Sequence, residues 1–75
     1  MEAYVLVSLD EPAEREILEE FQDLNEVKDS HILFGEWDLI LQITGESPEA
    51  IADFVIEKVR SKSSVKLTST LIVAQ

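Results

Sequence analysis

The chain of 75 residues carries 16 acidic and six basic side chains, for a net charge of −10, and it contains no cysteine. This composition excludes disulfides and zinc–thiolate sites, and it argues against direct binding to nucleic acid or to an anionic membrane, which both need a basic surface. A single domain this short buries only roughly 60% of its unfolded surface, so self-association is the remaining way to enlarge its core. The absence of a signal peptide and of a membrane-spanning run predicts a soluble cytoplasmic protein.

The first expected strand, Ala3–Leu9, is apolar on both of its faces. The segments Asp38–Ile43 and Leu67–Ala74 show the same pattern. A sheet with one face in water normally alternates between apolar and polar residues. We therefore expect a second copy of the chain to cover one face of this sheet, with Leu6 and Ile40 on that face.

A helix is expected after the first strand, from Asp10-Glu11-Pro12 to about Asn25. Proline and carboxylates both suit the first turn of a helix. The apolar side chains that follow have helical spacing and form one face: Ile17, Leu18, Phe21 and Leu24.

The second half of the chain repeats the alternation of strands and helix. Strands are expected over Val27–Phe34 and Asp38–Ile43, joined by a hairpin at Gly35. Ser47 and Pro48 predict the start of a second helix, with cations near its end, where the helix dipole favours them. The predicted buried face of this helix is Ile51, Phe54, Val55 and Val59. The last strand is expected over Val65–Ala74.

The resulting order of elements is β-α-β-β-α-β, and the two halves show a weak internal similarity. This order predicts an α+β, ferredoxin-like fold of the dimeric α/β-barrel type. Right-handed crossovers place both helices on one face of an antiparallel four-stranded sheet. The other face is left to a partner.

The hairpin tip Phe34-Gly35-Glu36-Trp37-Asp38 has two interpretations. In the simpler one it is only a turn, with Gly35 supplying the geometry, Asp38 bonding the turn and Trp37 packing on a neighbour. In the other it is a binding edge, whose backbone N–H groups hold a small carboxylate beside Trp37. The residues alone favour the simple turn.

Thr68-Ser69-Thr70 interrupts the apolar last strand with three hydroxyls. Threonine is common in strands, so β-propensity alone explains it. Buried hydroxyls nevertheless need partners, which a polar ligand supplies. Catalysis has less support, because His31 is the single histidine and no triad or glycine-rich phosphate loop is present. No catalytic residue, metal site or cofactor is expected.

The hairpin Gly35-Glu36-Trp37-Asp38 resembles the G-x-x-D hairpin of the Lrp/AsnC family of amino-acid-responsive regulators. Glu26-Val27-Lys28 resembles the segment after the first helix of that family, and the chain from Phe54 to Lys66 resembles its second helix and exit. Thr68–Val73 resembles the closing T-x-T-apolar strand. The similarity covers nearly the whole chain as one effector-binding (RAM) domain, residues 1–75, with Trp37 where the family usually has tyrosine or phenylalanine.

The regulators of this family also carry an N-terminal helix-turn-helix domain, for which a strand beginning at residue 3 leaves no room. A stand-alone RAM domain without its own DNA-binding domain is therefore expected. The resemblance implies dimers that pack sheet against sheet, rings of dimers such as octamers, and amino-acid effectors bound between dimers. The ligand-binding residues that it implies are Gly35, Glu36, Trp37, Asp38, Thr68 and Thr70.

Within this set, Gly35 would let the backbone approach the ligand, and the hairpin amides would meet its α-carboxylate. Asp38 would orient the hairpin or meet the ammonium, and Trp37 would line the wall. The leading hypothesis is a non-enzymatic oligomeric protein that senses an amino acid and co-assembles with full-length Lrp/AsnC regulators. The alternatives are a small monooxygenase or isomerase using His31 as acid or base, and a structural adaptor without a ligand.

Overall fold

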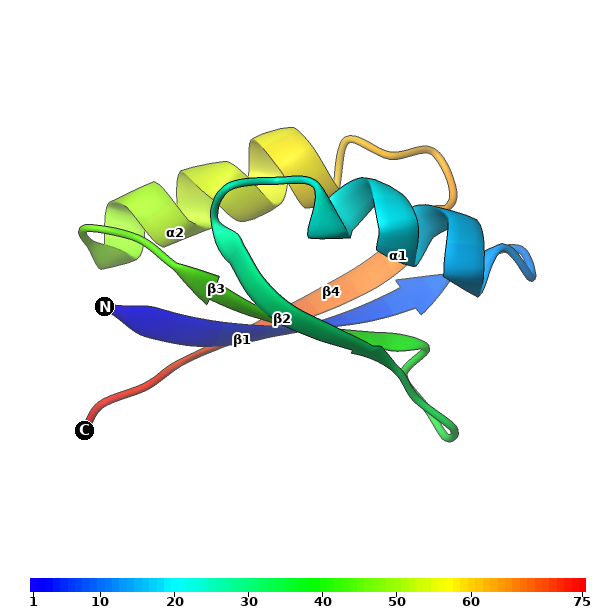
Figure 1. The fold of residues 1–75 in the computed structure, drawn as a ribbon, viewed down its shortest axis with the longest axis horizontal. Helices are drawn as coiled ribbons and strands as arrows, with labels where there is room; N and C mark the ends of the chain where they lie inside the picture. Colours follow the sequence, from blue (N-terminus) through cyan, green and yellow to red (C-terminus); the bar gives the residue numbers. More distant parts are fainter.

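The computed structural model describes residues 1–75 and has the ferredoxin-like order of elements that the sequence predicts. Its four strands are β1 (Glu2–Leu9), β2 (Val27–Ile32), β3 (Leu39–Thr44) and β4 (Val65–Ile72). They form one antiparallel sheet in the order β2-β3-β1-β4. Helix α1 (Glu14–Gln22) and a second helix, made of α2 (Pro48–Phe54) and η1 (Val55–Val59), both cover one face of the sheet (Figure 1). The predicted α+β architecture is confirmed.

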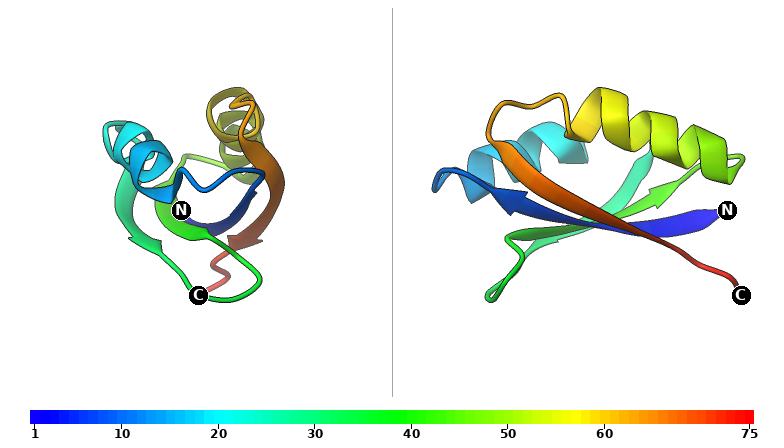
Figure 2. Two further views of the ribbon diagram at one scale, coloured as in Figure 1. Left: turned by 90° about the vertical axis from the view of Figure 1, so that its right-hand side faces the viewer. Right: turned by 180° about the vertical axis from the view of Figure 1, so that it is seen from behind.

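The hydrophobic core lies between the helices and the two central strands. Alternate residues of these strands point toward the helices and are fully buried: Ala3, Val5, Val7, Leu39, Leu41 and Ile43. The helices contribute these buried residues: Ile17, Leu18, Phe21, Ile51, Phe54, Val55 and Val59. Leu24, which is predicted on the same face as Phe21, lies beyond the end of α1 and is only partly buried. The strand residues between the buried ones point to the opposite face, which no helix covers (Figure 2).

Helix α1 begins at Glu14, so the prediction that Pro12 lies in its first turn is wrong. The N-cap residue, Ala13, makes no capping bond with its side chain. The chain ahead of the helix is held elsewhere, because the Asp10 N–H donates to the Ser64 carbonyl at 2.8 Å. The helix also ends earlier than expected, with Asp23 as its C-cap.

The second helix begins as predicted but ends in an unexpected form. Ser47 Oγ accepts a hydrogen bond of 3.1 Å from the Ala50 N–H, and Pro48 is the first helical residue. Residues Val55–Val59 form a π-helix, in which the Arg60 N–H donates to the Val55 carbonyl at 2.8 Å. Neither helix is both long enough and apolar enough to cross a membrane.

The connection between β2 and β3 is longer than the sequence predicts. Strand β2 ends at Ile32, two residues before the expected Phe34. Asp38 lies just outside β3, although its N–H donates to the Val7 carbonyl and its own carbonyl accepts from the Leu33 N–H. The resulting hairpin, residues 33–38, projects from the sheet on the side away from the helices (Figures 1 and 2).

Candidate functional site

The tip of the hairpin presents backbone donors that have no acceptor within the chain. Gly35 has a φ of +131°, a conformation that favours glycine because a Cβ is rarely accommodated there. None of the N–H groups from Phe34 to Trp37 donates a hydrogen bond to a backbone carbonyl or a side chain. These donors are therefore free to meet an external acceptor such as a carboxylate.

Asp38 fixes the base of the hairpin to the end of β1. Its Oδ2 accepts a hydrogen bond of 2.7 Å from the Leu9 N–H, in a partly buried position. The Asp38 N–H donates to the Val7 carbonyl at 2.8 Å, so both its side chain and its backbone bind the same strand. Of the two roles expected for Asp38, this geometry supports orienting the hairpin.

Thr68 and Thr70 lie on the side of β4 that faces the helices. They pair with Val7 and Val5, which point into the core, whereas Ser69 pairs with Leu6 on the other face. Neither threonine hydroxyl has a hydrogen-bond partner within the chain. Both threonines line a groove of about 350 Å³ between β4 and the second helix, together with Ala52, Val55, Ile56, Arg60 and Ile72. A volume of this size suits a small-molecule ligand.

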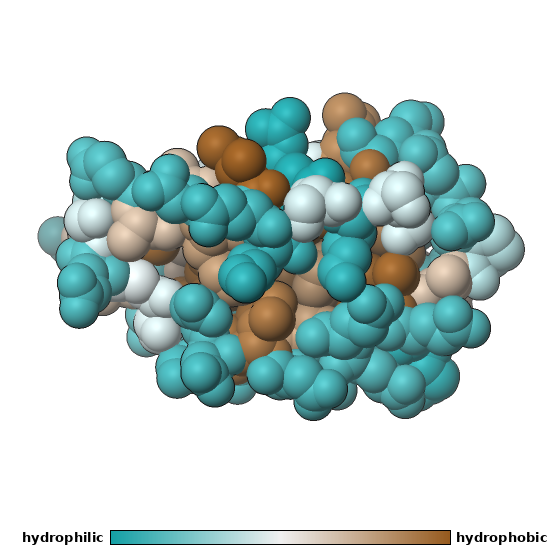
Figure 3. All heavy atoms as spheres, turned by 90° about the horizontal axis from the view of Figure 1, so that it is seen from above, coloured by the Kyte–Doolittle hydropathy of each residue, from teal (hydrophilic) through white to brown (hydrophobic).

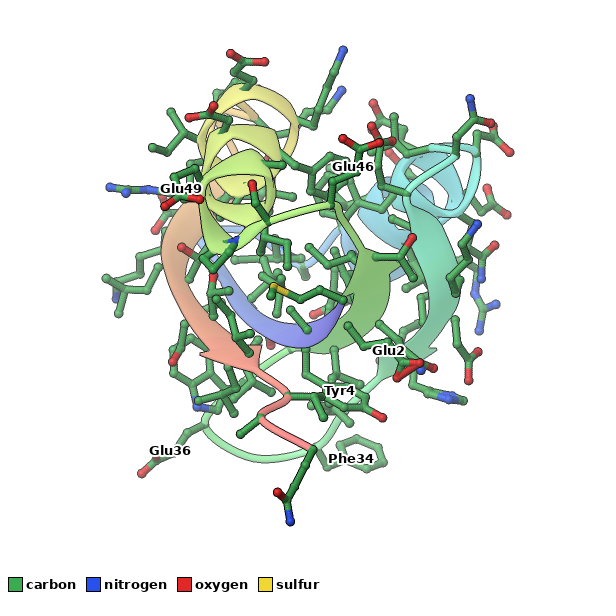
Figure 4. All side chains as sticks on the ribbon, turned by 90° about the vertical axis from the view of Figure 1, so that its left-hand side faces the viewer. Glu2, Tyr4, Phe34, Glu36, Glu46 and Glu49 are labelled. Atoms are coloured by element: carbon green, nitrogen blue, oxygen red, sulfur yellow. The ribbon has the colours of Figure 1, made fainter.

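The structure does not bring the hairpin and the threonines together within one chain. The hairpin projects away from the helices, whereas the threonines line a groove on the helix side (Figures 1 and 2). In a view along the sheet, Phe34 and Glu36 lie below it, on the side opposite the two helices (Figure 4). One small ligand at the hairpin tip therefore does not reach the threonine groove of the same chain.

Arg60 is the charged residue of the groove, and it is not among the predicted ligand-binding residues. The sequence indicates it only as one of the cations near the end of the second helix. Its position beside the threonines depends on how the second helix packs along β4, which the local sequence does not specify.

The uncovered face of the sheet is apolar in its middle. Strand pairing places Leu6 opposite Ile40 and Tyr4 opposite Leu71 on this face, which confirms the predicted positions of Leu6 and Ile40. Figure 4 shows Tyr4 and Phe34 on the same side, away from the helices. Seen from the helix side, by contrast, the molecule is mostly hydrophilic (Figure 3). We call the surface formed by Tyr4, Leu6, Ile40, Leu67, Ser69 and Leu71 the open face.

His31 lies at the edge of the open face. Its Nε2 is 3.3 Å from Asp29 Oδ2, and 65% of its side chain is exposed. It lines a hollow of about 250 Å³ with Tyr4, Asp29, Ile40 and Gln42. The space between the sheet and the helices holds the hydrophobic core, and His31 does not line it. No three His, Asp or Glu side chains are grouped closely enough to hold a metal ion.

A groove of this size at the edge of the sheet is large enough for a small ligand. Residues 2–75 match the family model described as the Lrp/AsnC ligand binding domain. The chain therefore belongs to this family of transcription-regulator domains, and the resemblance seen in its sequence is confirmed.

Individual relatives agree with this assignment. The chain is 32% identical over 73 residues to an uncharacterized HTH-type transcriptional regulator of Pyrococcus furiosus, covering 93% of this chain and 49% of that protein. It thus spans about half the length of the curated relatives it matches. Among solved structures, hypothetical protein PHS023 from Pyrococcus horikoshii is 30% identical, with a TM-score of 0.89 over 99% of this chain and 89% of that one.

A further solved structure contains an amino acid. The transcriptional regulator NMB0573 from Neisseria meningitidis, crystallised as a complex with L-Met, is 25% identical to this chain. Its TM-score is 0.86, and the match covers 99% of this chain and 49% of that one.

Proposed function

We propose that this chain is a non-enzymatic effector-binding domain that binds a free amino acid between the subunits of a homo-oligomer. The main observation in support is the position of the unpaired polar groups on opposite sides of the sheet. A ligand contacts both the hairpin and the threonine groove only when two subunits each supply one of them. Membership of a ligand-binding family, and the amino acid bound to a structural relative, support the same proposal.

Each part of the proposed site matches one end of an amino acid. The free N–H groups around Gly35 suit the α-carboxylate, and Trp37 forms an apolar wall beside it. The hydroxyls of Thr68 and Thr70, on a neighbouring subunit, accept hydrogen bonds from the ammonium group. Glu36 supplies a carboxylate at the hairpin tip for the same ammonium.

The subunit contact on which this site depends is a dimer formed through the open face. Its middle carries no charged side chain, although the whole chain has a net charge of −10. Two copies thus meet there without bringing acidic groups together, and a two-fold axis matches this surface to itself. Further assembly of dimers into a ring, such as an octamer, brings the hairpin of one dimer to the groove of the next.

The same open face can also pair with the corresponding domain of a full-length regulator of the family. The chain would then modulate that regulator by co-assembling with it. Native mass spectrometry of the two proteins mixed together tests this extension. Mixed oligomers are expected, and their absence contradicts co-assembly while leaving amino-acid binding untouched.

Calorimetric titration with a panel of free amino acids tests the sensing function. At least one amino acid is expected to bind. Thr70→Val keeps the shape of the side chain but removes its hydroxyl, and it should weaken that binding about 10-fold, the equivalent of one hydrogen bond. Ser63→Ala is the matched control, because this exposed hydroxyl lies outside both the groove and the open face.

Two results would count against the proposal. If no amino acid gives a heat signal, the sensing function is wrong and the structural adaptor remains. If Ser63→Ala weakens binding as much as Thr70→Val, the groove is not the binding site.

A further inference from the structure

Arg60 is an unpaired cation in the threonine groove. The two side-chain contacts between a basic residue or histidine and a carboxylate are His31–Asp29 and Lys62–Glu20, and Arg60 takes part in neither. No carboxylate lines the groove, whose other residues are Ala52, Val55, Ile56, Thr68, Thr70 and Ile72. A free guanidinium beside two free hydroxyls is suited to bind an anionic group.

The π-helix brings Arg60 to this position. In an α-helix, the residue that bonds back to the Val55 carbonyl would be Val59; here it is Arg60, at 2.8 Å. Arg60 therefore lies one turn beyond Val55, and both residues line the groove. Val59 meanwhile remains fully buried in the core. Irregular helical turns of this type are frequent at functional sites.

The segment that supplies Arg60, Thr68 and Thr70 is basic, unlike the rest of the chain. Residues 58–75 contain four of the six basic residues and no aspartate or glutamate. A second hollow next to the groove is lined by Arg60, Lys66, Thr68, Val65 and Leu67, again without a carboxylate. In a strongly acidic protein, the residues that line the proposed ligand site thus include basic side chains and no carboxylate.

We infer that the effector is an acidic amino acid, glutamate or aspartate, whose side-chain carboxylate is bound by Arg60. This inference rests on the proposed function and adds the class of ligand. The hairpin amides bind the α-carboxylate and the threonines bind the ammonium, so the second carboxylate is left to Arg60. Guanidinium and carboxylate form two parallel hydrogen bonds, which a neutral amide side chain cannot reproduce.

The test compares each acid with its neutral isostere by calorimetry at fixed ionic strength. L-glutamate is titrated against L-glutamine, and L-aspartate against L-asparagine. The protein is expected to bind one of the acids at least about 10-fold more tightly than its amide. Arg60→Gln should remove most of this preference by weakening the acid alone. Lys58→Gln removes the same charge two residues away, at an exposed position outside the groove, and should keep the preference.

The possible failures are distinguishable. Preferential binding of a neutral amino acid such as methionine or glutamine overturns the inference but leaves the proposed function standing. An equal loss of acid and amide binding in Arg60→Gln also overturns it, because Arg60 would then bind the α-carboxylate. If no amino acid binds, the proposed function and this inference both fail.

Discussion

The residues of the hairpin show how a recognisable motif gains its geometry from contacts distant in sequence. A glycine followed by acids and an aromatic predicts a turn with binding potential, and Gly35 does adopt a positive φ. The partner of the Asp38 carboxylate was not predictable, because Leu9 lies 29 positions away and is reached only through sheet pairing. The importance of Arg60 was missed for the same reason, since its neighbours in the groove come from another element.

The bond between Asp38 and Leu9 leads to a prediction about stability. Asp38→Ala leaves a partly buried N–H without an acceptor and should lower the free energy of unfolding by about 1–3 kcal/mol. Urea denaturation at matched protein concentrations measures this loss. Glu36→Ala is the control, because that carboxylate is exposed and makes no hydrogen bond within the chain. Equal stability of the two variants would show that the Asp38 carboxylate does not hold the hairpin.

At the level of elements, local signals predicted the second helix better than the first. Ser47 and Pro48 form the expected start, since a capping hydroxyl and a proline act within one turn. Asp10-Glu11-Pro12 gave a similar signal but lies outside α1, and the Asp10 N–H donates to the Ser64 carbonyl instead. The π-helix could not be predicted either, since the spacing of Ile51, Phe54, Val55 and Val59 also suits an α-helix.

The Ser47 cap leads to a prediction about how the second helix contributes to stability. Ser47→Ala removes the acceptor of the Ala50 N–H and should destabilise the protein by about 1 kcal/mol. Ser47→Asp, which retains a capping oxygen, should keep most of the stability. Thermal denaturation followed by circular dichroism compares them. If the alanine variant has the same melting temperature as the wild type, the cap does not contribute to the stability of this helix.

For the whole molecule, strand alternation correctly predicted which residues face away from the helices. The two-residue alternation of side chains along a strand was enough to place Leu6 and Ile40 on that face, because adjacent strand residues point to opposite faces of the sheet. The separation of the hairpin from Thr68 and Thr70 was not predicted, because it depends on the direction in which the hairpin leaves the sheet. That separation makes the proposed ligand site depend on a neighbouring subunit.

Self-association through the open face can be weakened with little effect on the single chain. Leu71 is 55% exposed in one chain, so Leu71→Asp costs the isolated fold little. In the proposed dimer it buries two unpaired charges, which is strongly unfavourable. Gln22→Asp is the control, because it adds the same charge on the exposed surface of α1.

Native mass spectrometry at low micromolar concentration tests this assembly most directly, with circular dichroism to verify folding. We predict a mass of two chains or a multiple of two for the wild type and for Gln22→Asp, and a folded single chain for Leu71→Asp. A wild-type protein that is folded and has the mass of one chain would contradict the dimer, and with it the ligand site between subunits.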